Sequence, residues 1–440
     1  MTEARSILIK GAELIDEAGR SRRKDVRFCG DTITAVGALK PRANEQCVDA
    51  EGGLLIPGLH DHHVHLASYA AALQSVRCGP PEVNSEAELV EAINRPGSGW
   101  LRGTGFQEGV CQQLNRAWLD QHGPNRPVRI QHRSGRLWIF NTLAIEQVKA
   151  AAASLAPHEQ VRVSRPDGLY YDADEILGGL IRSEAPPIGQ ASQRLVKLGV
   201  TGINDMTPTN DGVAWDWFLG LQNSGDLLQR VRMSGRAELS AQSSLPGLTC
   251  GEVKVHLHDT VLPELESFVE LIGTSHSSGR GVAVHCVTEV ELVFTLAAFR
   301  AAGTLKGDRI EHASVMPFEL VEQVVELGLG VVTQPNFVFE RGDAYLRDVP
   351  ELQHDSLYRV RSLIDQGIAT AFGTDLPFGN PDPWAAMRAA TERRTLSGEW
   401  LGEHEAVSPE RALSGFLGSL ENPFVQRTVT VVSESDALWL

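Results

Sequence analysis

The chain has 440 residues, of which 42% are hydrophobic and 22% are charged, a composition typical of a globular protein with a large buried core. Its formal net charge of -16 argues against general binding to nucleic acids or anionic membranes, because phosphate groups repel such a surface. Scattered cysteines without a CxxC pair, an N-terminus without a signal-peptide core, and the lack of any apolar run of about 18 residues predict a cytoplasmic protein with free thiols and no membrane span.

Short strands open the chain. Ser6–Gly11, Asp25–Phe28 and Thr32–Gly37 are strand-like runs separated by glycine-rich or charged turns, and they predict a small antiparallel unit. The tail offers two further strands, Arg427–Val432 and Ala437–Leu440, which we expect to rejoin this unit. The small domain is then discontinuous, made of residues 1–54 and 421–440, and it flanks a larger domain of residues 55–420.

A cluster of histidines follows the small unit. The apolar run Leu54–Ile56 predicts a short buried strand that ends in Pro-Gly and leads into the sequence HDHHVH. Side chains alternate along an extended strand, so His63 and His65 point the same way. Two imidazoles on one face can bind one metal ion, because the neutral ring offers a nitrogen lone pair.

The middle of the chain shows a less regular pattern. We expect a helix at Ser85–Asn94, strands at Trp100–Gly103 and Pro127–His132, and loops over residues 150–171. Residues 67–125, 156–185 and 336–356 are weakly patterned and are expected to form the loops that set specificity. A helix at Ile188–Leu198 then precedes a strand at Gly199–Asp205.

Strand and helix alternate regularly after residue 250. This rhythm predicts a parallel sheet, and the number of repeats favours a closed (β/α)8 TIM barrel in the α/β class. Helices are expected near residues 357–366, 383–396 and 409–417. The alternating strands are Val253–His258, Gly281–Cys286, Asp308–His312, Gly330–Gln334 and Ile368–Asp375, and the helices between them are Pro263–Ser275, Glu289–Ala302 and Phe318–Leu327.

Ligand-capable residues recur along the predicted barrel strands. Chemistry in such barrels is carried by the carboxyl ends of the strands, where His285, His312 and Asp375 join His63 and His65. Each of these alone is weak evidence, because buried histidines are often satisfied by hydrogen bonds and an aspartate after a strand often caps a helix. Together they predict a shared metal site.

Lys254 lies on one of the same strands, although an ammonium group has no lone pair for a metal. A buried lysine with a lowered pKa can react with carbon dioxide, and the carbamate formed offers two oxygens to bridge two ions. The alternative is a lysine that stays charged, pairs with a carboxylate and leaves a mononuclear site. One or two divalent ions per chain are therefore expected, with zinc favoured.

The chain resembles the amidohydrolase superfamily, in the branch of the YtcJ-like and N-substituted formamide deformylase-like proteins. The resemblance implies a metal-bearing (β/α)8 barrel with a small β-sandwich from both termini, and activity on C–N bonds. It also implies that His63, His65 and Asp375 hold one ion, that His285 and His312 hold the other, and that Lys254 bridges them. The motifs that carry it are Pro57–His65, Val253-Lys254, Val284-His285, Arg309–Ala313, Thr333–Pro335 and Phe372–Pro377.

We expect hydrolysis of an amide, N-formyl or cyclic amide bond in a small molecule. Asp375 would orient the attacking water, take its proton and pass it to the leaving nitrogen. A deaminase or isomerase on the same scaffold and a non-catalytic metal-binding homologue stay open as alternatives, as does a homo-oligomer. The residues expected to contact substrate are Arg136, Trp138, Asn141, His258, Gln334 and Phe378.

Two features depart from the branch. Arg136 stands where the branch often has a histidine, in a Gly-His-x-x-Trp-like stretch. A substrate carboxylate would be a natural partner for this arginine, and a surface salt bridge is an equally good interpretation. Strand alternation also places His256 and His258 on the face of Lys254, so His258 is expected at the pocket mouth as a substrate contact or an extra ligand.

Overall fold

The computed structural model describes residues 6–15, 21–30, 32–156, 160, 163–181, 186–417 and 429–432. The chain divides into two compact units, one formed by Met1–His65 with Ser192–Leu440 and the other by Leu66–Ala191. The second unit, which the sequence pattern does not reveal, is called the inserted unit here. Among the described residues, none of the helices has the length and apolar character needed to cross a membrane.

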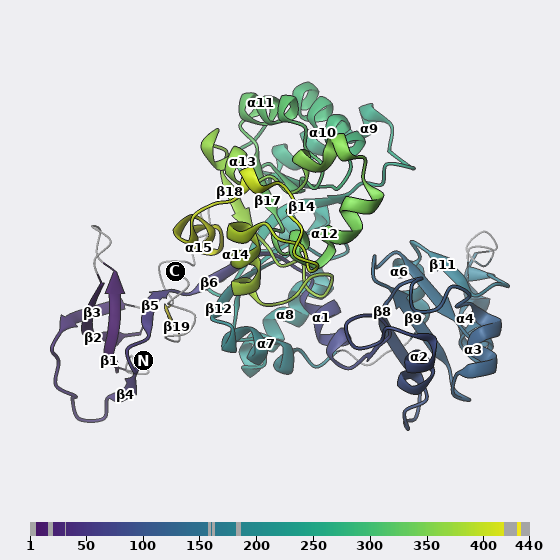
Figure 1. Cartoon of the computed structure of the whole chain (residues 1–440), viewed down its shortest axis with the longest axis horizontal. Helices are drawn as coiled ribbons and strands as arrows, with labels where there is room; N and C mark the ends of the chain where they lie inside the picture. Colours follow the sequence, from purple (N-terminus) through teal and green to yellow (C-terminus); the bar gives the residue numbers. More distant parts are fainter. Residues whose placement is uncertain are drawn as a thin grey trace. The chain divides into compact units, whose positions relative to one another are not determined.

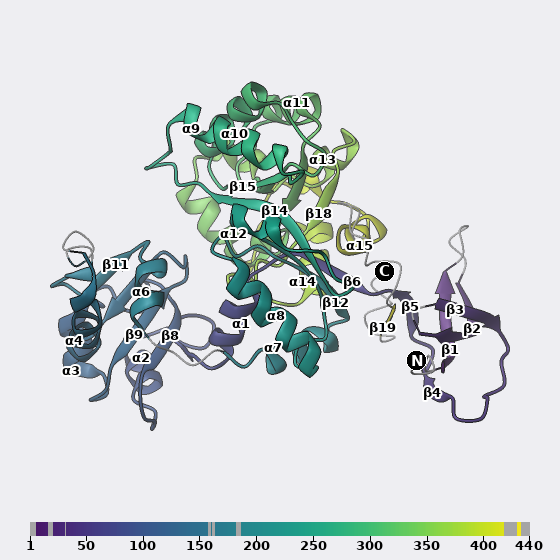
Figure 2. The same cartoon turned by 180° about the vertical axis from the view of Figure 1, so that it is seen from behind.

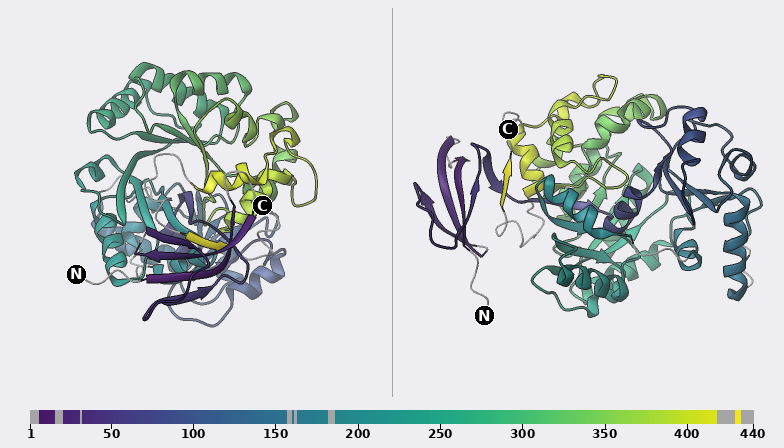
Figure 3. Two further views of the ribbon diagram at one scale, coloured as in Figure 1. Left: turned by 90° about the vertical axis from the view of Figure 1, so that its left-hand side faces the viewer. Right: turned by 90° about the horizontal axis from the view of Figure 1, so that it is seen from below.

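The two ends of the chain meet in a small sheet (Figure 3). The C-terminal strand β19 pairs antiparallel with β5, with Val429 opposite Pro57. The expected strand at Ala437–Leu440 falls outside the described residues. Apolar side chains such as Ile9, Val26 and Phe28 form the core of this sheet. Its strands are β1 (Ser6–Ile15), β2 (Ser21–Cys29), β3 (Thr32–Gly37), β4 (Gln46–Asp49), β5 (Leu54–Pro57) and β19 (Val429–Val432).

The apolar run Leu54–Ile56 does not lead directly into the histidines as one strand, contrary to the interpretation of the sequence. It belongs to β5, which pairs with β1 and β19 in the small sheet. His60, His62 and His63 lie on the next strand, β6 (Leu59–Val64), and His65 follows its last residue. Gly58 therefore separates two strands of different sheets.

Eight parallel strands form the barrel, in the order β18-β17-β16-β15-β14-β13-β12-β6. The first and last strands meet where Asp375 N donates to His63 O over 2.9 Å and Val64 forms a parallel bridge to Leu376. The expected α/β barrel is thus confirmed. Its strands are β6 (Leu59–Val64), β12 (Val200–Asp205), β13 (Arg230–Gly235), β14 (Leu248–His256), β15 (Val282–Cys286), β16 (Arg309–His312), β17 (Gly330–Thr333) and β18 (Thr370–Phe372).

Helices alternate with these strands. Figures 1 and 2 show α9, α10 and α11 grouped on the side of the barrel where β14 and β18 lie. Helices α10, α11 and α15 have the bounds expected from the sequence, and Thr288 and Glu291 form a capping box at the start of α10. The helices are α7 (Ile188–Lys197), α8 (Gly212–Ser224), α9 (Leu265–Ser277), α10 (Glu289–Ala302), α11 (Phe318–Leu327), α12 (Asn336–Asp348), α13 (Arg361–Asp365), α14 (Pro383–Glu392) and α15 (Pro409–Leu417), with short 3-10 turns at Ala237–Ala241, Glu351–Ser356 and Glu403–Glu405.

The sequence pattern does not predict strand β13 or helix α12, for different reasons. Strand β13 was missed because two arginines interrupt its apolar residues, and one of them, Arg232, pairs with Glu252 on β14. The expected loop at 336–356 is wrong, because α12 occupies Asn336–Asp348. Gly342 suggests a turn there, but its missing side chain allows close packing instead, since a Cβ would lie 2.5 Å from Thr395 Cγ2.

The inserted unit has its own mixed sheet, in the order β11-β10-β9-β8-β7. Strands β7, β8 and β9 are parallel, whereas β10 and β11 are antiparallel to their neighbours. Two apolar clusters, one around Ile130 and one around Phe140, form its core. Its elements are α1 (Leu66–Leu73), β7 (Val76–Arg77), α2 (Glu86–Ile93), β8 (Leu101–Phe106), α3 (Arg116–His122), β9 (Val128–His132), β10 (Leu137–Phe140), α4 (Thr142–Ala151), a 3-10 turn (Ala152–Ser154), β11 (Leu169–Tyr171) and α6 (Asp174–Leu180).

Candidate metal centre

Three of the expected ligands form a tight cluster at the meeting point of β6 and β18. The ligand atoms of His63, His65 and Asp375 all lie within 4.8 Å of one another. Asp375 Oδ1 is 3.6 Å from His63 Nε2 and 3.4 Å from His65 Nε2. This oxygen is buried and has no hydrogen-bond partner. A buried carboxylate oxygen facing two imidazole nitrogens suits a cation, because a cation satisfies all three lone pairs.

The backbone holds two of the site residues in an uncommon conformation. Asp375 has a φ of 56° and His312 has a φ of 70°, both in the left-handed region that favours glycine. Non-glycine residues persist there when the surrounding structure fixes them, and such residues cluster at functional sites. The hydrogen bond from Asp375 N to His63 O is one such constraint.

The other two histidines continue the cluster as a row of imidazoles. The ring centroids of His63 and His312 are 4.7 Å apart, and those of His312 and His285 are 4.4 Å apart. Burial lowers the pKa of His63, His285 and His312. Their rings therefore stay neutral near pH 7, which is the form that binds a metal.

Lys254 is buried on β14, and its Nζ has no hydrogen-bond partner. Burial lowers its pKa, although Glu311 acts in the opposite direction. An isolated buried ammonium is costly. The expected alternative, an ammonium paired with a carboxylate, is not found, because no ion pair of Lys254 occurs among the described residues.

Hydrogen bonds from other side chains orient the histidines. His63 Nδ1 lies 2.6 Å from Glu311 Oε2, and Arg309 Nε donates to Glu311 Oε1 over 2.6 Å. His312 Nδ1 lies 2.7 Å from Gln334 Oε1, and His65 Nδ1 lies 3.2 Å from Thr207 Oγ1. In each case Nδ1 is engaged, which leaves Nε2 free for a ligand.

Glu311, Arg309 and Thr207 are functional candidates that the sequence analysis did not assign. The signal available was the pair of charged residues two apart in the buried strand β16, since both side chains share a face and are fully buried. Arg309 also lies 3.5 Å from Glu252, so the buried charge of Glu311 belongs to a compensated network.

The charges around Asp375 fix its protonation. Burial raises the pKa of this carboxyl, but His65, with its Nε2 3.4 Å away, and the neighbouring His63 and His312 outweigh it and hold the pKa below its usual range. Asp61 shows the opposite balance: burial raises its pKa to about 7 despite hydrogen bonds from Thr374. Asp375 is therefore the carboxylate that is ionised at neutral pH.

Phe378 and Gln334, both expected to contact substrate, lie beside candidate ligands, and His258 is linked to one through His256. The Phe378 ring meets the His65 ring edge-on, with centroids 5.6 Å apart. The ring of His258 is 4.5 Å from that of His256, which in turn is 4.1 Å from His285. Gln334, expected to line the pocket, uses its carbonyl oxygen to bind His312.

The other three expected contacts belong to the inserted unit, and each makes contacts within it. Arg136 forms a two-pronged ion pair with Asp172, at 2.8 and 2.7 Å. Trp138 is buried with the guanidinium of Arg102 5.3 Å from its ring centre. Asn141 caps α4 by accepting from Ala144 N.

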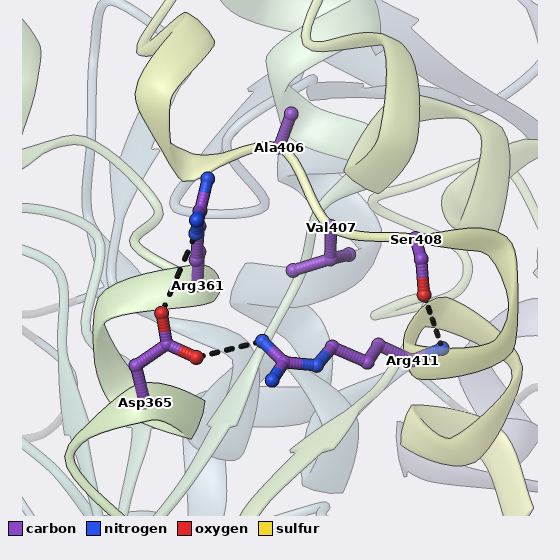
Figure 4. A pocket seen from close by; sticks show the side chains of 6 residues that line it. All are labelled: Arg361, Asp365, Ala406, Val407, Ser408 and Arg411. Atoms are coloured by element: carbon purple, nitrogen blue, oxygen red, sulfur yellow. Dashed lines mark hydrogen bonds and ion pairs between the residues drawn. The ribbon is translucent and has the colours of Figure 1, made fainter.

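A separate hollow of about 410 Å³ lies between α13 and the start of α15 (Figure 4). Asp365 sits between two arginines there and accepts from Arg411 Nη1 over 2.7 Å. None of its lining residues is a candidate ligand, and its charges are already paired. The residues are Arg361, Asp365, Ala406, Val407, Ser408 and Arg411.

Known proteins share this sequence and architecture. A sequence model described as "Amidohydrolase family" matches residues 46–415. N-substituted formamide deformylase from Arthrobacter pascens is 24% identical, over 94% of this chain and 88% of its own length. Putative amidohydrolase YtcJ from Bacillus subtilis (strain 168) is 22% identical, over 79% of this chain and 75% of its own length. An uncharacterized metal-dependent hydrolase from Pyrococcus horikoshii OT3 has the same fold, with a TM-score of 0.75, 19% identity, and coverage of 93% of this chain and 91% of that one.

Proposed function

The chain belongs to the amidohydrolase family, and we propose that it is a metal-dependent hydrolase that cleaves a C–N bond of an amide, an N-formyl group or a cyclic amide. The observation that carries the proposal is the cluster of His63, His65 and Asp375, whose ligand atoms lie within 4.8 Å of one another. The name of the Arthrobacter pascens relative, a deformylase of N-substituted formamides, supports the choice of bond.

The donor set suits one or two divalent ions, with zinc favoured by imidazole and carboxylate ligands. His63, His65 and Asp375 would hold one ion, and His285 with His312 would hold a second. A carbamate on Lys254 would bridge them. The buried Nζ without a partner supports this role, because carboxylation replaces an unpaired amine with an anion that two cations would neutralise.

A divalent ion at this centre supplies Lewis acidity, lowering the pKa of a water toward 7 and polarising the substrate carbonyl. Asp375 accepts the proton of the attacking water. It then returns the proton to the nitrogen as the C–N bond breaks, so the amine leaves neutral and the acyl group leaves as a carboxylic acid. Glu311 and Gln334 hold His63 and His312 in fixed orientations throughout.

Elemental mass spectrometry of the purified protein, after growth with zinc and bicarbonate, tests the metal centre first. About two ions per chain are expected from the carbamate-bridged arrangement, and about one would leave Lys254 as a free amine. A panel of formamides, linear amides and cyclic amides then tests the reaction. Absence of metal after reconstitution, or a metal-loaded protein that hydrolyses none of the panel, would overturn the proposal.

A further inference from the structure

Arg341 lies on α12, close to the candidate metal centre. Its Nη2 donates to Phe378 O over 2.6 Å, and its Cζ lies 3.8 Å above the ring centre of Phe337. Phe378 links it to the centre in two ways, because Phe378 N donates to Asp375 O over 2.7 Å and the Phe378 ring meets that of His65. The guanidinium therefore contacts Phe378, which itself contacts the candidate ligands Asp375 and His65.

The buried arginines of the barrel have several partners. Arg309 pairs with Glu311 and Glu252, and Arg359 pairs with Glu405. Arg393 donates to four backbone carbonyls, those of Leu357, Tyr358, Leu401 and Gly402. These contacts explain why such arginines can be buried, since each N–H that loses water gains another acceptor.

Arg341 differs from them. Among the described residues it makes the single hydrogen bond to Phe378 O and pairs with no carboxylate. The adjacent Glu340 is not its partner, because that carboxylate accepts from Asn336 Nδ2 and from Asn380 N. Arg341 is partly exposed, so several of its five N–H groups remain available to a ligand.

Guanidinium groups recognise planar anions, since two parallel N–H groups match the two oxygens of a carboxylate. We propose that Arg341 binds a carboxylate of the substrate and makes the enzyme selective for amides that carry one. This inference rests on the proposed function. The carboxylate can belong to the amine half, as in an N-acyl amino acid, or to the acyl half, as in a monoamide of a dicarboxylic acid.

Paired substrates test the proposal and separate these two sources. N-formylglycine is compared with N-methylformamide, and succinamate is compared with butyramide. We measure kcat/KM for the wild type, Arg341→Leu, Arg341→Lys and the control Arg347→Leu. Arg347 lies on the same helix, its side chain is 68% exposed, and among the described residues its ion pair is with Asp348.

Arg341→Leu removes the positive charge that would pair with the substrate carboxylate. It should therefore lower kcat/KM for the anionic member of one substrate pair by about 100-fold, mainly through KM. The neutral member should change less than about threefold, because its contacts stay intact. Arg341→Lys should recover part of the loss, and Arg347→Leu should match the wild type. An equal loss on anionic and neutral members would show that Arg341 only supports the Phe378 loop, and would overturn the inference.

Binding gives a readout that does not depend on turnover. Calorimetric titration of the metal-loaded proteins with N-formylglycine and with succinamate should show binding to the wild type that is at least tenfold weaker in Arg341→Leu. Binding of either anion by a metal-loaded protein that hydrolyses none of the amide panel would overturn the proposed function and leave the role of Arg341 standing. Hydrolysis of amides with no preference for the anionic members, or no binding of either anion, would overturn the role of Arg341 and leave the proposed function standing.

Discussion

The barrel and the inserted unit both carry polar residues at strand ends, yet these residues meet different partners. In the barrel, side chains from β6, β15 and β16 lie beside one another as a row of imidazoles. In the inserted unit, Arg136 and Asn141 bind to neighbours of their own sheet and helix. A ring of parallel strands brings all its carboxyl ends to one rim, whereas antiparallel pairs such as β9 and β10 send successive ends to opposite edges. A polar residue after a strand therefore indicates a shared site only where the sheet is parallel and closed.

Asp375→Asn tests the barrel half of this comparison most strongly. The amide cannot accept the water proton, so we expect kcat to fall by at least about 10³-fold while the fold is retained. Steady-state rates are measured on the best substrate of the amide panel, with far-UV circular dichroism and metal content as controls. A variant that keeps a near wild-type rate would remove Asp375 from the proton transfer.

Glu311→Gln tests whether the orientation of His63, and not only its presence, determines the metal affinity of the centre. The substitution keeps the shape but removes the charge that holds His63 Nδ1, and loss of such a support usually weakens metal affinity by about 10- to 100-fold. Competition with a chelator measures the affinity, and Glu326→Gln, which alters an exposed ion pair with Arg300, is the matched control. Equal metal affinity in both variants would show that Glu311 does not support the centre.

The pH dependence of stability tests the polar barrel interior through His60. Burial lowers the pKa of His60 to about 3, and its Nε2 lies 2.8 Å from the side-chain amide of Asn204. The unfolded chain binds a proton below about pH 6.5 and the folded chain does not, so stability falls as the pH falls from about 6.5 toward 3, by about 1.4 kcal/mol per pH unit. Between pH 7 and pH 5 the contribution of His60 is about 2 kcal/mol.

Urea unfolding of the metal-free protein at the two pH values measures this loss, and His60→Gln should show a loss smaller by that amount. The same loss in both proteins would show that another group titrates over this range.

The parts of the molecule that the sequence predicts are those in which local pattern and final environment agree. Strands such as Val282–Cys286 are apolar and carry a candidate ligand, His285, near their end, and the α10 sequence begins with its own capping box. The sequence does not predict the role of Glu311, because that role is a hydrogen bond to His63, which is 248 residues away along the chain. The sequence does not predict the inserted unit either, because its helix and strand signals resemble those of the barrel. Only the pairing of strands that are distant in the sequence distinguishes the two sheets.

Asn141→Ala tests the inserted unit, where we expect a change in stability and not in turnover. Asn141 accepts from Ala144 N and Val128 N and donates to Arg126 O. Loss of a helix cap and these bonds should lower the free energy of unfolding by about 1–2 kcal/mol. Asn141→Asp keeps the cap acceptor and should lose less. Denaturant unfolding gives the stability, and loss of kcat/KM at unchanged stability would favour the substrate contact expected from the sequence.

Arg136→Leu should have the smallest effect of the series. Its ion pair with Asp172 joins side chains that are 43% and 39% exposed, and pairs at such exposure contribute about 0–1 kcal/mol, because water screens the charges. Its guanidinium already binds the carboxylate of Asp172 through Nε and Nη2, whereas Arg341 pairs with no carboxylate among the described residues. The ratio of kcat/KM between N-formylglycine and N-methylformamide should therefore stay at the wild-type value in Arg136→Leu and fall in Arg341→Leu. The reverse result would return anion recognition to Arg136 and the inserted unit.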